Sequence, residues 1–309
     1  MTAKNKKIAW LGFVIIIILI ILFIVLRNKP TNEVADTSPF VDANGRLAVI
    51  TTLFPVYDFA KVVGGDKASV SLILPEGSEA HAYRPTAEDK EIIKQSAIFF
   101  YTSDLMEPWA PDLAGSLSPR TKMLAVADGL NNETLDPHVW LDFSKASLMV
   151  DDILAEYKLV DPANATYYEQ NATQYKQELS KLDADYVAGL KDCNFHEFIS
   201  GGHFAFGYLA KRYNLKYQAV QGFAPDDSLD TDKVLRLSKE LKDTKQPYVY
   251  YEELIMPYLA ELMRQSSGAN LMPLNAAHNI SAYDIESGIT FIGLMESDLT
   301  ILRKGLICR

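Results

Sequence analysis

The feature that most constrains the fold is one long helical pattern in the middle of the chain. It covers residues 161–190, within which Pro162 is the last proline and Gly189 the first glycine. Apolar residues recur along it at intervals of three and four, which is the spacing of one continuous helical stripe: Tyr168, Ala172, Tyr175, Leu179, Leu182 and Tyr186. A helix of about 30 residues spans about 45 Å, which is longer than one small α/β unit needs. We therefore predict a connector that packs along two lobes.

Short apolar segments alternate with amphipathic segments on both sides of this pattern. Strands are predicted over residues 47–52, 70–74, 98–101 and 123–126, and again over 197–200, 217–220, 248–251 and 271–274. Helices are predicted over 56–63, 86–95, 107–117 and 143–157, and again over 204–213, 230–242, 257–266 and 284–306. Such alternation favours mainly parallel sheets covered by helices. The predicted fold class is α/β, with two α/β sandwich lobes joined by one long helix: an N-terminal lobe over 47–160, a linking helix over 161–191 and a C-terminal lobe over 192–309.

The first 29 residues differ from the rest. An uncharged run over residues 8–26 follows three lysines and is closed by Arg27 and Lys29. At about 1.5 Å per residue this run reaches across a bilayer core. No small-residue cleavage site and no anchor cysteine follow it, so an uncleaved signal anchor is favoured over a cleaved signal peptide. The lysine excess places the N-terminus in the cytoplasm, with residues 1–29 as tip and transmembrane helix, 30–46 as a tether, and the remainder outside the cytoplasm.

Charge and cysteine content narrow the possible functions. The formal net charge of −10 argues against a nucleic-acid partner, because phosphate binding requires a basic surface. The chain has two cysteines, Cys193 and Cys308, and an even pair outside the cytoplasm favours a disulfide over two unrelated thiols.

Four of the five histidines occupy equivalent positions in the predicted pattern. His81, His138, His203 and His278 each follow the carboxyl end of a predicted strand, and parallel sheets bind ligands at that edge. Two belong to each lobe, so the space between the lobes is where all four could meet. His196 precedes a strand and is expected at the opposite edge, outside any site.

Four imidazoles in one place favour a borderline metal ion. Neutral imidazole suits zinc, copper, iron and nickel, whereas manganese and magnesium prefer oxygen ligands. Four nitrogen ligands complete a tetrahedron around zinc and leave no position for a reactive water. Zinc binding is then expected to weaken as the pH falls through the ordinary imidazole range near 6.5.

Several segments carry a resemblance to a known family. They are residues 50–59 (Ile-Thr-Thr-Leu-Phe-Pro-Val-Tyr-Asp-Phe), 81–86 (His-Ala-Tyr-Arg-Pro-Thr), 136–142 (Asp-Pro-His-Val-Trp-Leu-Asp), 203–213 and 250–253. Through them the chain resembles the metal-specific substrate-binding proteins of zinc and manganese ABC transporters. The resemblance implies two lobes bridged by one helix, with the metal ion between them.

The resemblance also implies a ligand at each of the positions of His81, His138 and His203. Manganese-type members tend to carry Glu at the position of His203, so the histidine indicates zinc. The fourth ligand is usually an acidic residue in the loop after the last short strand. This chain offers His278 there, with Asp284, otherwise a helix N-cap, as the less favoured alternative.

The predicted function is therefore a membrane-anchored, extracytoplasmic zinc-binding protein that delivers Zn²⁺ to an ABC transporter permease subunit and is not an enzyme. Glu252 and Glu253, at the end of a strand, are expected to hold a ligand imidazole by its second nitrogen. Two alternatives stay open at this point. One is a zinc hydrolase with three histidine ligands and a glutamate base, although no HExxH or nucleophile-elbow motif supports it. The other is an adhesion protein in which the metal is structural.

Overall fold

The computed structural model describes residues 40–130, 135–224, 230–252 and 257–309. The anchor predicted over 1–29 lies outside these residues, as does the tether up to residue 39. Among the helices within them, none combines the length and the apolar character needed to cross a membrane. Residues 40–46, expected in the tether, fold against the first strand, since Val41 bridges to Leu47 and Arg46 pairs with Asp42 at 2.7 Å.

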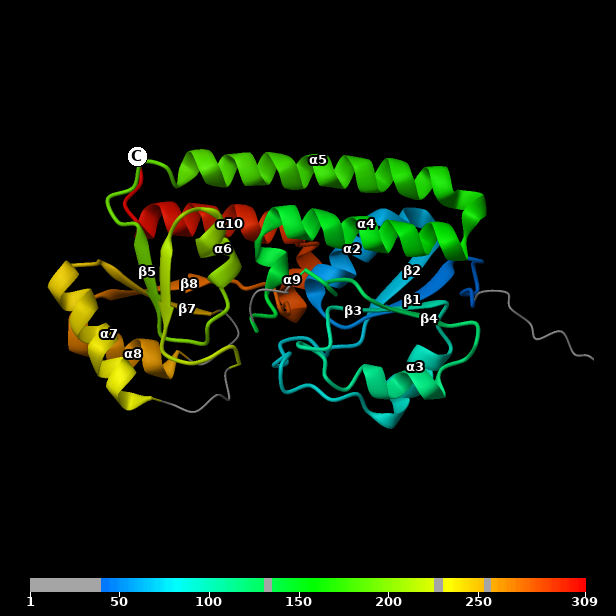
Figure 1. Cartoon of the computed structure of the whole chain (residues 1–309), viewed down its shortest axis with the longest axis horizontal. Helices are drawn as coiled ribbons and strands as arrows, with labels where there is room; N and C mark the ends of the chain where they lie inside the picture. Colours follow the sequence, from blue (N-terminus) through cyan, green and yellow to red (C-terminus); the bar gives the residue numbers. More distant parts are fainter. Residues whose placement is uncertain (1–39, 131–134, 225–229, 253–256) are drawn as a thin grey trace, which may run out of the picture. The chain divides into compact units, whose positions relative to one another are not determined.

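Two four-stranded, all-parallel sheets form the framework (Figure 1). The first has the order β2-β1-β3-β4 and consists of β1 (Leu47–Thr51), β2 (Ala68–Leu72), β3 (Ile98–Tyr101) and β4 (Lys122–Ala125). The second has the order β6-β5-β7-β8 and consists of β5 (Glu197–Ser200), β6 (Lys216–Ala219), β7 (Tyr248–Glu252) and β8 (Asn270–Leu274). The equivalent strand orders confirm the prediction of two α/β lobes with parallel sheets.

Helices cover both faces of each sheet. They are α2 (Phe54–Gly64), α3 (Ala87–Lys94), α4 (Phe143–Val160), α5 (Ala165–Gly189), α6 (Gly207–Arg212), α7 (Thr231–Thr244), α8 (Tyr258–Ser267), α9 (Ala282–Ser287) and α10 (Phe291–Gly305). Short 3₁₀ helices are η1 (Gly65–Lys67), η2 (Pro111–Ser116), η3 (Val139–Leu141) and η4 (Pro162–Asn164). A capping box starts α3, with Thr86 and Asp89 bonded to each other's backbone amides.

The long helical pattern forms α5, which runs above α4 and α10 from one sheet to the other (Figure 1). All six residues of the predicted apolar stripe are buried. The Tyr175 hydroxyl donates to Asp58 in α2 at 2.8 Å, and the Tyr186 hydroxyl donates to the Met295 carbonyl in α10 at 2.7 Å. The helix therefore ties elements of both lobes together; the residue boundaries of the lobes stay a prediction.

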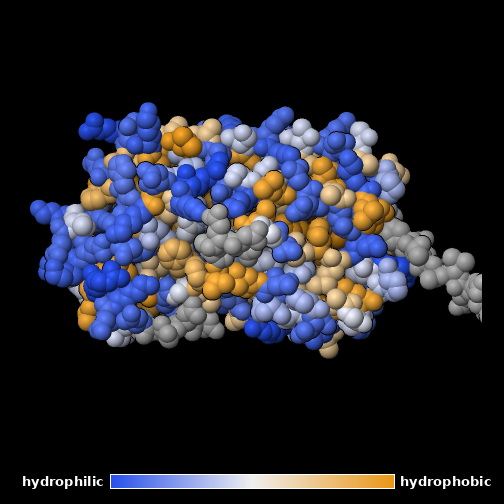
Figure 2. Space-filling model, in the orientation of Figure 1, coloured by the Kyte–Doolittle hydropathy of each residue, from blue (hydrophilic) through white to orange (hydrophobic). Residues whose placement is uncertain are grey.

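The two lobes share one hydrophobic core on the face of the sheets below α5. Phe59 of α2 packs edge-on against Phe291 of α10, with ring centroids 5.1 Å apart, and both belong to a cluster that includes residues of both sheets. The opposite face of each sheet has its own smaller cluster, under α3 in the first lobe and under α7 and α8 in the second. A hydrophilic surface lies over α7 (Figure 2), consistent with its alternation of buried and charged residues.

Three predicted helices differ from the sequence pattern: two are shorter, and one is divided in two. Only η2 forms within 107–117, because Pro108 and Pro111 lack the amide protons that an α-helix needs. The helix predicted over 204–213 begins at Gly207. The closing helix over 284–306 is wrong as one element: Gly288, with a φ of +73°, ends α9, and the Thr290 side chain accepts from the Gly293 amide to start α10.

Cys193 and Cys308 form a disulfide, which confirms that prediction. The bond joins the segment after α5 to the end of α10, and the two residues also form an isolated antiparallel bridge. The C-terminus is thereby fixed to the start of the second lobe.

Candidate metal centre

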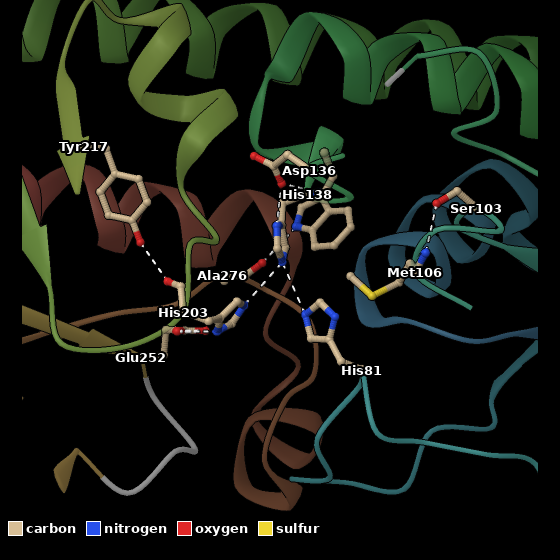
Figure 3. Close-up of polar contacts among 10 residues, drawn as sticks. His81, Ser103, Met106, Asp136, His138, His203, Tyr217, Glu252 and Ala276 are labelled. Atoms are coloured by element: carbon tan, nitrogen blue, oxygen red, sulfur yellow. Dashed lines mark hydrogen bonds and ion pairs between the residues drawn. The ribbon is translucent and has the colours of Figure 1, made fainter. Parts of the chain in front are cut away.

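The structure brings together the four histidines that follow strands. His81 lies beyond β2, His138 beyond β4, His203 beyond β5 and His278 beyond β8, so each reaches the site from the carboxyl edge of a sheet. One ring nitrogen from each lies within 4.8 Å of those of the other three. Figure 3 shows the imidazoles of His81, His138 and His203 turned toward one another. His196 precedes β5, where its carbonyl accepts from the Lys216 amide, and it is not part of this cluster.

Two of the distances between the nitrogens match those of a tetrahedral zinc site. With bonds of about 2.0–2.1 Å, two ligand nitrogens of a tetrahedron lie about 3.3 Å apart. Nε2 of His138 lies 3.4 Å from Nε2 of His81 and 3.3 Å from Nε2 of His203. The His278 ring lies 4.7 Å from the His138 ring between centroids, and its Nε2 is buried with no hydrogen-bond partner among the described residues. An unpartnered buried nitrogen is costly unless a ligand takes its lone pair.

Burial favours the neutral form of three of these imidazoles, those of His81, His138 and His278, and the neutral form is the one that binds a metal. Burial lowers the pKa of His81 to about 3, and the pKa values of His138 and His278 fall well below the ordinary 6.5 for the same reason. The adjacent imidazoles add to the effect, because two charged rings at these distances would repel. The expected weakening of zinc binding near pH 6.5 stays a prediction, and the lowered pKa values of His81, His138 and His278 favour proton competition at lower pH.

Two carboxylates orient two of the rings. Oδ1 of Asp136 lies 2.6 Å from Nδ1 of His138 and also accepts from the His138 backbone amide at 3.0 Å. Oε1 of Glu252 lies 2.7 Å from Nδ1 of His203. In His138, a proton held at Nδ1 by Asp136 leaves the Nε2 lone pair free for a metal ion. Nδ1 of His203 and Oε1 of Glu252 are paired by distance, without the angles of a hydrogen bond. Figure 3 shows both carboxylates directed at the imidazoles.

The structure thus places Glu252 where the sequence predicted a supporting carboxylate, while Glu253 lies outside the described residues. Asp136 was not predicted in this role. The signal was available in the spacing Asp136-Pro-His138, because a carboxylate two residues before a histidine can accept from its amide and reach its ring. Burial raises the pKa of Asp136 to about 7.

The loop that carries His278 is held in part by the first lobe, although β8 belongs to the second. The Trp140 indole donates to the Ala276 carbonyl at 2.8 Å, and the Phe54 amide donates to the His278 carbonyl at 3.3 Å. The Asn279 side chain donates to the carbonyls of Pro75 and Ser78, at 2.7 and 2.9 Å. The loop of His278 is therefore held by both lobes, since its Asn275 amide also donates to the Asp298 carboxylate in α10 at 3.0 Å.

Asp284 does not join the cluster. It lies in the first turn of α9, where its carboxylate accepts from the amide and hydroxyl of Ser281 at 3.1 and 2.6 Å. The Asp284 amide in turn donates to the Ser281 hydroxyl. These bonds form a capping box in which Ser281, not Asp284, is the capping residue.

Comparison with known proteins identifies the family. The family model described as "ZnuA: Zinc-uptake complex component A periplasmic" matches residues 49–305. The chain belongs to this family. It is 30% identical over 320 residues to the high-affinity zinc uptake system protein ZnuA of Bacillus subtilis (strain 168), an alignment that covers 97% of this chain and 98% of that protein.

A second relative and a solved structure agree with this membership of the ZnuA family. The chain is 31% identical over 282 residues to the zinc-binding lipoprotein AdcA of Streptococcus pneumoniae (strain ATCC BAA-255 / R6), which covers 85% of this chain but only 56% of AdcA. The chain therefore spans little more than half of that relative. The crystal structure of the Zn(II)-bound ZnuA-like domain of Streptococcus pneumoniae AdcA superimposes with a TM-score of 0.75 at 32% identity, over 85% of this chain and 99% of that domain.

Proposed function

We propose that this protein captures Zn²⁺ outside the cytoplasm and delivers it to the permease of an ABC transporter. The observation that carries the proposal is the convergence of four imidazole nitrogens within 4.8 Å of one another. Membership of the ZnuA family and the named zinc-uptake and zinc-binding relatives support the same role. A family of zinc-uptake components indicates a binding protein and not an enzyme.

We propose that His81, His138, His203 and His278 bind the ion through Nε2. An all-imidazole set suits zinc better than manganese, which prefers oxygen donors. Four protein ligands fill a tetrahedral zinc ion and leave no position for a reactive water, so the site favours binding and release over hydrolysis. The three-histidine hydrolase would require His278 to lie away from the others, which its position within the cluster disfavours.

We further propose that residues 1–29 anchor the protein in the membrane and keep the binding lobes on its outer side. The uncharged run over 8–26 supports the anchor, and the description of the family as periplasmic supports the location. The Cys193–Cys308 disulfide fits an oxidising compartment.

Metal analysis of the full chain tests the function. We expect the protein purified in detergent from its own membranes to contain one zinc ion per chain, and disruption of its gene to abolish growth at limiting zinc, with recovery when zinc is added. Manganese or iron as the bound metal, or growth at limiting zinc without the protein, would contradict the proposal.

A further inference from the structure

Two glycines of the second lobe lie against the two carboxylates that orient the histidines. A Cβ added at Gly202 would lie 2.7 Å from Oε1 of Glu252, and one added at Gly207 would lie 2.5 Å from Oδ2 of Asp136. Side-chain carbon atoms are not found so close to other heavy atoms. We propose that Gly202 and Gly207 are positioning residues of the metal centre, because only a residue without a Cβ leaves each carboxylate room to reach its imidazole. This inference rests on the proposed zinc-binding function.

The requirement for glycine does not come from the backbone conformation. Neither Gly202 nor Gly207 is among the residues with positive φ, so alanine is compatible with the backbone at both positions. Gly207 is the first residue of α6, where alanine is ordinarily the better helix former. Helix propensity alone therefore predicts that Gly207→Ala leaves the protein as stable or makes it more stable. The proposed contact with Asp136 predicts that the same substitution lowers the zinc affinity.

At Gly202 the carboxylate must move, since the glycine itself is held in place. Its amide donates to the Ser200 hydroxyl at 3.1 Å, and its carbonyl accepts from the Gln221 amide at 3.2 Å. The three atoms nearest to an added Cβ belong to the side chains of Glu252 and Ser200. The methyl group of an alanine would consequently displace Oε1 of Glu252, which is the atom 2.7 Å from Nδ1 of His203.

At Gly207 the contact crosses between the lobes. Asp136 follows β4 of the first lobe, whereas Gly207 begins α6 of the second. An added Cβ would meet Oδ2 of Asp136 and, at 2.5 Å, the ring of Phe204. The close packing of α6 on Asp136 thus holds Oδ1 of the same carboxylate against His138, so the approach of the two lobes and the orientation of a metal ligand depend on each other.

The test measures the zinc affinity of the full chain in detergent by competition with a chelating indicator. Gly202→Ala and Gly207→Ala are each expected to weaken zinc binding by about 10- to 100-fold, the usual cost of losing a carboxylate behind a ligand histidine. Gly115→Ala is the matched control, because an added Cβ there meets nothing within 4 Å and its φ is not positive. It is expected to bind zinc like the unsubstituted chain.

A second readout separates positioning from a general loss of structure. Glu252→Gln should weaken binding about as much as Gly202→Ala, and the double variant should be no weaker than either single variant, since both changes remove the same contact. The NMR signals of the His203 ring, which lies 2.7 Å from Oε1 of Glu252, should shift in Gly202→Ala and stay unchanged in Gly115→Ala. If Gly207→Ala fails to fold, Gly202→Ala decides the matter, because the three atoms nearest to its added Cβ belong to side chains.

The outcomes distinguish this inference from the proposed function. Zinc binding by the unsubstituted chain together with undiminished binding by Gly202→Ala would overturn the role of the glycines alone. Failure of the unsubstituted chain to bind zinc would overturn the proposed function instead.

Discussion

His138→Ala is expected to weaken zinc binding by roughly 10²- to 10³-fold. Zinc held by four protein ligands is stabilised by about 10–16 kcal/mol, so one ligand contributes about 2.5–4 kcal/mol, and each 1.4 kcal/mol is a factor of ten. His138 is the best choice because it is fully buried and its Nε2 lies within 3.4 Å of two of the other Nε2 atoms. Indicator competition with the full chain measures the affinity.

The control for this substitution is His196→Ala. His196 lies before β5 and outside the cluster, so its loss should leave the zinc affinity unchanged. Equal weakening by both substitutions would mean that the effect comes from general destabilisation. An unchanged affinity in His138→Ala would remove that residue from the site.

Zinc is expected to raise the melting temperature of the protein by on the order of 10 °C. A ligand that binds only the folded state stabilises it by about 4.1 kcal/mol at a thousand times its Kd, and 1 kcal/mol corresponds to about 2–4 °C in domains of 150–250 residues. In the folded zinc-free protein, burial lowers the pKa of His81 to about 3 and those of His138 and His278 well below 6.5, so these three imidazoles stay neutral at pH 6. The increase should therefore persist at pH 6 and disappear only at lower pH.

Scanning calorimetry with and without zinc, at pH 7.5 and pH 6, checks this expectation. The same series with His138→Ala is the control, and its zinc-dependent increase should be much smaller. An increase that vanishes between pH 7.5 and 6 would show that protons compete at the ordinary imidazole pKa, and that the histidines are exposed in the zinc-free state.

Local sequence patterns predicted the strands and the long helix, because the burial of apolar side chains that produces these patterns also stabilises these elements. Apolar runs bounded by Gly, Pro and polar residues became the eight strands, and the apolar stripe from Tyr168 to Tyr186 became the buried face of α5. The predictions were wrong where a glycine, a helix-capping residue or a proline interrupts a periodic segment. Gly288 and Thr290 divide the closing helix, and Pro108 and Pro111 limit residues 107–117 to a 3₁₀ helix.

The histidine cluster was predictable because parallel strands align their carboxyl ends at one edge, and all four histidines follow such ends. The residues that orient the histidines were harder to predict from the sequence. The role of Asp136 depends on its loop turning back on His138, and the roles of Gly202 and Gly207 depend on contacts that no local pattern encodes. That the loop of His278 is held in part by the first lobe follows from bonds to Trp140, Phe54 and the carbonyls of Pro75 and Ser78, which are distant in the sequence.

A crystal structure of the zinc-loaded full chain tests the central claim most directly. The claim is that four imidazoles from both halves of the chain bind one ion. The expected result is a single zinc ion with Nε2 of His81, His138, His203 and His278 at about 2.0–2.1 Å in a tetrahedron. A zinc ion with water or a carboxylate in place of His278, or an ion bound elsewhere in the protein, would contradict the account.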